Sequence, residues 1–165
     1  MKILVAGVGN VFLGDDGFGV AVARLLAKRE LPEGVVATDF GIRGVHLAYE
    51  LTGGRYDCTI LVDAVSRGGP PGTLYVIRPT AGEDPGTFVD AHDMTPDAVL
   101  ALADTLGGTG QVLLVGCEPA DVSPGMELSP PVADAVPRAA DLVLELVPEQ
   151  IATASAVAGR KEERT

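Results

Sequence analysis

The first twenty residues, Met1 to Val20, read MKILVAGVGNVFLGDDGFGV and predict a strand that turns into a helix. Residues 2–6 are an almost unbroken apolar run, too short for a helix and typical of a strand that is covered on both faces. Glycines and two aspartates fill the turn that follows, and apolar residues then recur at helical spacing from Phe18 to Leu26. We therefore expect the function of the protein to reside at this strand-to-helix turn.

The glycine turn is a partial match to the dinucleotide-binding fingerprint. Gly7 and Gly9 have the required spacing, but Phe12 stands where a third glycine or alanine would let the helix pack on the strand. The helix start also carries Asp15 and Asp16, whose negative charges would repel a pyrophosphate. These carboxylates either cap the helix N-terminus or attract a cation, and the sequence leaves both interpretations open.

The composition is that of one acidic globular domain. The chain has 165 residues, of which 47% are hydrophobic, and this is enough to bury a substantial core. A formal net charge of -11 argues against nucleic acid or an anionic membrane as the main partner. No apolar run is long enough to span a membrane and no signal-peptide pattern opens the sequence, so we expect a cytoplasmic protein. Cys58 and Cys117 lie alone in apolar strand patterns and are expected to be buried small hydrophobic residues.

The rest of the chain alternates predicted strands with predicted helices. Further strands are expected at residues 35–40, 58–65, 73–78 and 111–117, and helices at 16–29, 45–51, 95–106 and 130–147. The connection at 66–72 is too short for a crossover helix, so the strand after it should run antiparallel. The predicted fold is α/β: a three-layer sandwich with a mostly parallel five-stranded sheet, one antiparallel strand and helices on both faces. This single domain should span residues 1–148, with a loose C-terminal tail at 149–165.

Three side chains suited to metal binding fall at the strand ends and loops of this predicted fold. Asp16 follows the first strand, Asp63 ends the apolar third strand, where a carboxylate is costly unless it is paired, and His92 lies in the longest predicted loop. Two carboxylates and one imidazole suit nickel, zinc or manganese and leave positions open for water or substrate. Ser66 and Cys117 lie near the same edge but lack the sequence signature of an activated nucleophile.

The second predicted strand supplies candidates for binding a substrate. Asp39, Gly41 and Gly44 follow or end this strand and border the same predicted cleft, where they could hold a substrate peptide. An ordinary loop at the start of a helix would use the same residue types, so both interpretations stay open.

Four segments taken together resemble the maturation endopeptidases of nickel-iron hydrogenases. They are ILVAGVGNVFLGDDGFGV, LVDAV followed by PPGTLYV, DAHDMTP, and VGCEPADVSPGMELSPPV, in this order over residues 1 to about 147. The resemblance implies an α/β sandwich and an endopeptidase that removes a C-terminal extension from the hydrogenase large-subunit precursor after nickel insertion. It also implies that Asp16, Asp63 and His92 are the metal-binding positions, with Asp16 one methylene shorter than the glutamate often found there. The nickel would then belong to the substrate and would not be a resident cofactor.

The mechanism that we expect goes one step beyond both lines of reasoning: the precursor's nickel docks on Asp16, Asp63 and His92. The metal would help to place or polarise the scissile peptide or a water, so these three residues are also the predicted catalytic residues. No nucleotide, nucleic acid or membrane is expected as a partner. Two rival functions stay open: a nucleotide-binding α/β protein that binds an adenine or flavin cofactor, and a non-enzymatic metal-binding protein that cleaves no precursor.

Overall fold

The computed structural model describes residues 2–41, 57–77 and 111–163, which contain a five-stranded sheet. The strands are β1 (Ile3–Val8), β2 (Val35–Gly41), β3 (Cys58–Ala64), β4 (Leu74–Ile77) and β5 (Gln111–Cys117), in the spatial order β2-β1-β3-β5-β4. β4 runs antiparallel to β5, and every other neighbouring pair is parallel. The predicted mostly parallel sheet with an antiparallel fourth strand is therefore confirmed.

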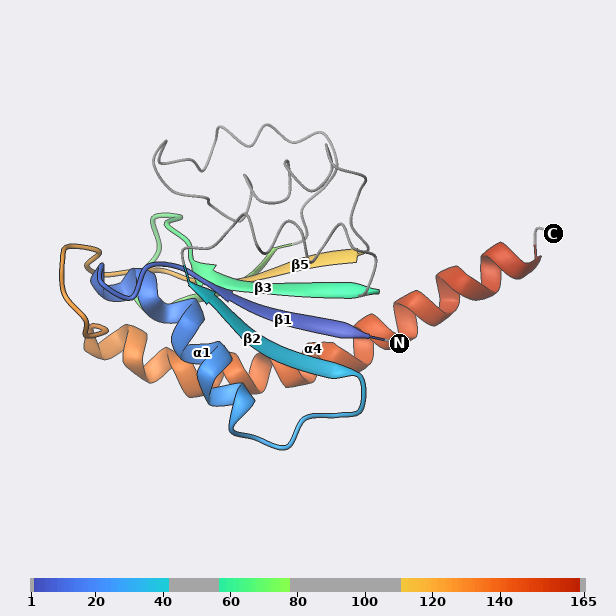
Figure 1. Cartoon of the computed structure of the whole chain (residues 1–165). Helices are drawn as coiled ribbons and strands as arrows, with labels where there is room; N and C mark the ends of the chain where they lie inside the picture. The colour runs from blue at the N-terminus through green and yellow to red at the C-terminus, as the bar shows by residue number, and fades with distance from the viewer. Residues whose placement is uncertain (1, 42–56, 78–110, 164–165) are drawn as a thin grey trace.

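Two helices, α1 (Phe18–Ala27) and α4 (Pro130–Glu163), lie on the same face of the sheet (Figure 1). The main core fills the space between them and alternate residues of the strands, and it includes Ile3, Val5, Phe18, Val22, Ile60, Val62, Leu113, Val115, Val132, Ala139 and Val143. The other face of the same strands is also buried, as Leu4, Ala6 and Leu61 show. Burial on both faces explains why these strands are apolar throughout and do not alternate. The helices predicted at 45–51 and 95–106 lie outside the described residues.

Helix α1 packs closely on the sheet because a glycine faces the strands. A side chain at Gly19 would collide with the backbone carbonyl of Val62 in β3, and one at Gly7 would collide with the carbonyl of Gly19. In the dinucleotide-binding fingerprint, the third glycine lets the helix pack closely on the strand. In this protein Gly19, further along the helix, has that part.

The start of the first helix differs from the prediction. Residues Gly14–Gly17 form a short 3-10 helix, η1, and the α-helix begins only at Phe18, so Asp16 lies in the turn before α1. At the start of η1 and at the start of α1, the N-cap residue makes no side-chain hydrogen bond. The interpretation of Asp15 as a helix cap is therefore wrong, because its buried carboxylate accepts its hydrogen bonds from a different segment of the chain.

Helix α4 is longer than predicted. It continues past Pro148 to Glu163, so most of the segment predicted as a loose tail from residue 149 is helical. Proline removes one backbone hydrogen bond but keeps a helical φ, and the sequence after it is rich in alanine, glutamate, lysine and arginine, which favour helix. The C-terminal half of α4 extends beyond the sheet, away from the carboxyl ends of β1 and β3 (Figure 1). Within the described part of the chain, neither α4 nor any other helix has the long apolar stretch needed to cross a membrane.

Candidate active site

Asp16 and Asp63 lie at the carboxyl-terminal edge of the sheet, on either side of Gly9. Asp16 follows β1 in the η1 turn, and its Oδ2 accepts a hydrogen bond from the backbone nitrogen of Asn10 at 2.8 Å. Asp63 is only 6% exposed near the end of β3, and its Oδ1 accepts a hydrogen bond from the nitrogen of Ala64 at 2.7 Å. Gly9 has a φ of 138°, and a Cβ there would collide with the carbonyl of Asp16 and lie 3.2 Å from Asp63 Oδ1. The structure therefore places Asp16 and Asp63 on the two sides of Gly9, at a position that only glycine fits.

The two carboxylates fit the chemistry of a divalent cation. They come from different elements, and carboxylate oxygens are ligands that nickel, zinc and manganese accept in proteins. A nearly buried carboxylate such as that of Asp63 also gains when a cation lies beside it. Within the described residues, no group of three or more histidines, cysteines or acids forms a complete metal site. The predicted third ligand, His92, lies outside the described residues, as does Gly44, whereas Gly41 is the last residue of β2.

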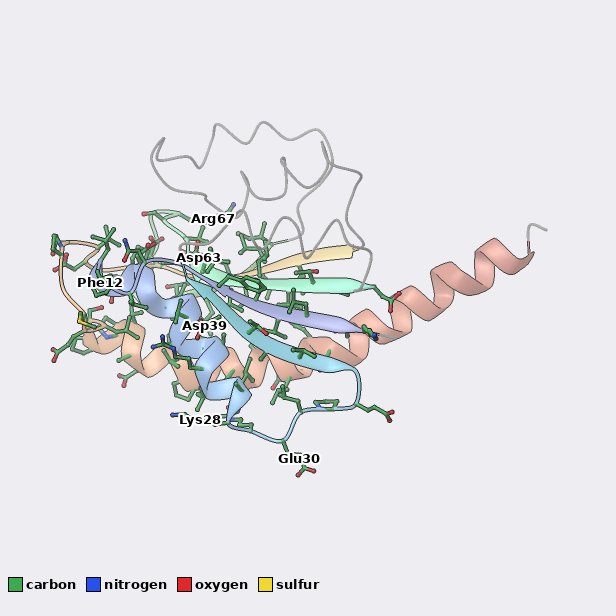
Figure 2. The ribbon with its side chains drawn as sticks, in the orientation of Figure 1. Phe12, Lys28, Glu30, Asp39, Asp63 and Arg67 are labelled. Carbon is green, nitrogen blue, oxygen red and sulfur yellow. The ribbon has the colours of Figure 1, made fainter. Side chains whose placement is uncertain are left out.

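Asp39 lies on the opposite face of the sheet from Asp63. Its Oδ2 accepts a hydrogen bond from Arg24 Nε of α1 at 3.1 Å. Gly7 is in register with both Asp39 and Val62, so Asp39 shares a face with Val62, and Asp63, the next residue of β3, points the other way. Figure 2 shows Asp39 beside α1 and Asp63 at the left-hand end of the strands, where β3 ends. The substrate-binding role of Asp39 stays a prediction, and it would act from the α1 side.

Asp15 joins the η1 turn to the loop that follows β5. Its side chain is fully buried and accepts hydrogen bonds from the backbone nitrogens of Ala120, Asp121 and Ser129 at 2.8, 2.9 and 2.7 Å, and from the Ser129 hydroxyl at 2.8 Å. Burial alone would raise the pKa of Asp15, but these hydrogen bonds outweigh it and hold the pKa below its usual value. The ionised carboxylate therefore holds the loop after β5 against the η1 turn, next to Asp16.

Glu118 fixes the loop at 66–72 in the same way. It is buried directly after β5, and its Oε1 accepts hydrogen bonds from the backbone nitrogens of Arg67 and Gly69, each at 2.8 Å, and from the Tyr75 hydroxyl at 2.9 Å. Burial raises the pKa of Glu118 and the hydrogen bonds lower it, with a net pKa below the usual value. The sequence interpretation missed this residue, although an acid beside a buried strand is the same signal that singled out Asp63.

The cysteines are buried free thiols, as predicted. Burial, assisted by the nearby Asp15 carboxylate, raises the pKa of Cys117 to about 11. Cys117 is therefore protonated at neutral pH, and its Sγ donates a long hydrogen bond to the carbonyl of Glu118 at 3.7 Å. A thiol in this state is a poor nucleophile, which argues against cysteine chemistry at this edge.

Comparison with known proteins decides the family. The sequence profile of the hydrogenase maturation protease family matches residues 20–146. The chain belongs to this family. Its relatives include the coenzyme F420 hydrogenase subunit delta of Methanothermobacter thermautotrophicus, 35% identical over 87% of this chain and 93% of the relative. The hydrogenase expression/formation protein HupD of Bradyrhizobium diazoefficiens is 33% identical over 93% of this chain and 82% of the relative.

Solved structures agree with this assignment. The hydrogenase maturating endopeptidase HybD from Escherichia coli is 32% identical, with a TM-score of 0.74 over 90% of this chain and 93% of that chain. The hydrogenase 2 maturation peptidase from a Thaumarchaeota archaeon is 37% identical, with a TM-score of 0.70 over 90% of this chain and 99% of that chain. These relatives confirm the predicted family and the three-layer α/β sandwich. This hydrogenase maturation protease is thus an endopeptidase, and the family provides no support for the rival non-enzymatic functions.

Proposed function

We propose that this endopeptidase removes the C-terminal extension of the nickel-iron hydrogenase large-subunit precursor after nickel insertion, and that it recognises the nickel carried by that substrate. The observation that supports the proposal is the placement of Asp16 and Asp63 at one edge of the sheet, across Gly9. In this proposal the two carboxylates bind the divalent cation that the precursor carries. In this proposal His92 supplies the third ligand.

The chemistry of these ligands favours a metal that arrives with the substrate. Two carboxylates and one imidazole, without a thiolate, make a weak and open site for nickel. Such a site holds the ion firmly only when the precursor supplies further ligands of its own. Docking of the precursor through its metal would hold the scissile peptide beside Asp63, and this positioning is itself a large part of catalysis.

Water is the proposed attacking group. It adds to the scissile carbonyl carbon, the carbon–nitrogen bond breaks, and the leaving nitrogen takes up a proton as the new carboxyl group forms. The nickel of the substrate would polarise the peptide or the water. Cys117 is poorly suited as the nucleophile because it is a buried protonated thiol. The Ser66 side chain is hydrogen-bonded to the Glu118 carboxylate, whose lowered pKa makes it a weak base for activating a hydroxyl.

The test is incubation of the protease, stripped of metal by a chelator that is then removed, with nickel-loaded and nickel-free forms of the precursor. Mass spectrometry of the products should show that only the loaded precursor loses its C-terminal extension. Serine-directed and thiol-directed reagents should leave the cleavage intact. Equal cleavage of the nickel-free precursor, or complete block by either reagent, would contradict recognition of substrate nickel. Failure to cleave either form would contradict the proposed substrate itself.

A further inference from the structure

Two loops at the functional edge are joined by backbone hydrogen bonds. The nitrogen of Gly14 donates to the carbonyl of Gly125, and the nitrogen of Gly125 donates to the carbonyl of Phe12, each at 2.8 Å. The nitrogen of Asp15 donates to the carbonyl of Asp121 at 2.9 Å, and the Asp15 carboxylate accepts from the backbone nitrogens of Ala120 and Asp121. The segments 10–14 and 120–126, more than a hundred residues apart in sequence, therefore form one fixed unit.

This unit carries large apolar side chains in solvent. Phe12 is 61% exposed, Val122 50% and Met126 72%, and they are three of the five exposed large hydrophobic residues in the described part of the chain. Local hydrogen bonds hold the backbone beside them, since Phe12 nitrogen donates to Asn10 Oδ1 at 2.9 Å and the Ser123 nitrogen donates to Asp121 Oδ1 at 2.8 Å. Apolar side chains gathered on two joined loops are typical of an interaction surface. We call Phe12, Val122 and Met126, with the acidic residues beside them, the paired-loop surface.

The paired-loop surface is continuous with the candidate active site. The Asn10 side chain that holds the Phe12 backbone belongs to the same residue whose nitrogen donates to Asp16 Oδ2 at 2.8 Å. Asp16 also follows directly after Asp15, the residue that joins the two loops. Figure 2 shows Phe12 at the same end of the molecule as Asp63, on the outer side. A protein that presents a peptide to Asp16 and Asp63 would therefore meet this surface as well.

The charge around the paired-loop surface indicates what it binds. Neither residues 3–23 nor residues 111–137 contain a lysine or arginine, whereas the exposed Asp121 and Glu127 stand beside the apolar side chains. The chain as a whole has a formal net charge of -11. A fitting partner thus has apolar side chains flanked by basic ones, because charges of opposite sign steer and align such a contact.

We propose that the paired-loop surface docks a folded region of the hydrogenase large-subunit precursor that presents apolar side chains beside lysine or arginine, separate from the segment that is cleaved. The inference rests on the proposed function for the identity of the partner. The apolar side chains supply affinity by removing their area from water. The acidic residues supply orientation, so that the metal centre and the scissile peptide arrive at Asp16 and Asp63 together.

The experiment measures cleavage of purified nickel-loaded precursor by the full-length protease and by surface variants. A Phe12→Ser/Met126→Ser double variant should lower kcat/KM by about tenfold or more, mainly through a higher KM, because exposed aromatic and methionine anchors carry much of a docking contact. Glu127→Lys should also raise KM, and its effect should shrink as salt is added. The matched control is Val36→Ser, which removes an exposed apolar side chain from β2 and should leave kcat and KM unchanged.

The outcomes separate this inference from the proposed function. If the wild-type protease cleaves the precursor and the double variant does so with the same KM, docking on this surface is refuted while the proposed function stands. A rise in KM of the same size in Val36→Ser would refute it too, because the effect would not be local. The single variant Met126→Ser, at the most exposed of the three side chains, repeats the test if the double variant does not fold. Binding of the nickel-free precursor, which the proposed function predicts is not cleaved, should be weakened by the same surface changes.

Discussion

Asp15 and Asp16 are consecutive carboxylates in different surroundings. Asp15 is fully buried and accepts four hydrogen bonds from the loop after β5 and the start of α4. Asp16 is partly exposed at the edge that it shares with Asp63. A 3-10 turn has three residues per turn and points consecutive side chains in directions about 120° apart, which separates the two carboxylates. One acid of the pair thus holds the edge together, and the other is placed to meet the substrate.

Removing the charge of Asp63 should have the largest effect on cleavage. We expect Asp63→Asn to reduce cleavage of nickel-loaded precursor by at least about a hundredfold, the size of effect seen when a group that stabilises the reacting centre is lost. Its thermal stability should stay close to that of the wild type, because asparagine has nearly the same volume and its Oδ1 can still accept the hydrogen bond from Ala64. Product mass and a thermal melt of the same sample measure both quantities.

Asp141→Asn is the matched control for this substitution. Asp141 pairs with Arg29 on the surface, at 2.8 Å, and both side chains are partly or largely exposed. Its loss should leave cleavage at the wild-type rate. Normal processing by Asp63→Asn would move the chemistry away from this edge.

Replacing Asp15, the neighbouring acid, should instead lower the stability of the folded protein. Asp15→Ala leaves the backbone nitrogens of Ala120, Asp121 and Ser129 without their acceptor, and we expect the free energy of unfolding to fall by about 3–5 kcal/mol. Urea unfolding at neutral pH measures the loss. A change within about 0.5 kcal/mol, as expected for an exposed acid such as Asp141, would show that Asp15 does not hold the two loops together.

Low pH should weaken the hydrogen bonds that Asp15 and Glu118 accept. The pKa values of Asp15 and Glu118 are lower in the folded protein than their ordinary values of 3.8 and 4.5. The stability that they contribute is fully present above those ordinary values and is lost as the pH falls through the lowered values. The free energy of unfolding should therefore drop below about pH 5, and it should drop less in Asp15→Asn and in Glu118→Gln than in the wild type. Parallel pH curves for all three proteins would contradict this.

The smallest effect is expected at the buried thiols. Replacing both Cys58 and Cys117 by serine should cost about 1–3 kcal/mol of stability, because a hydroxyl takes the place of a less polar thiol in the core. Cleavage of nickel-loaded precursor should continue at close to the wild-type rate when measured below the melting temperature. Loss of cleavage in a folded double variant would make one of these thiols part of the reaction.

The sequence predicted the sheet well because its signals are local. The apolar runs defined the strands to within two residues at each described end, β5 included, and the short connection at 66–72 predicted the antiparallel strand β4. Family resemblance and strand ends together singled out Asp16 and Asp63, which the structure places at one edge.

The role of Asp15 could not be predicted, because it depends on distant partners. Its hydrogen-bond donors lie 105 to 114 residues further along the chain, and the residue type alone suits a helix cap equally well. The surroundings of Glu118 depend in the same way on residues of the 66–72 loop. The prediction ended helix α4 too early for a different reason. A proline followed by small residues has the pattern of a helix end, even where the helix continues.

The sequence separation of the Asp15 hydrogen bonds bears on the order in which contacts form during folding. Asp15 meets Ser129 across 114 residues, and the loop between β5 and α4 follows a strand that pairs with β3. Contacts between such distant segments form late, because closing so large a loop is entropically unfavourable. A nascent chain that ends before Ser129 already contains Asp16 and Asp63, yet its edge is not assembled. Cleavage activity should therefore require the chain through Ser129, because the hydrogen bonds of Asp15 to the loop after β5 depend on it.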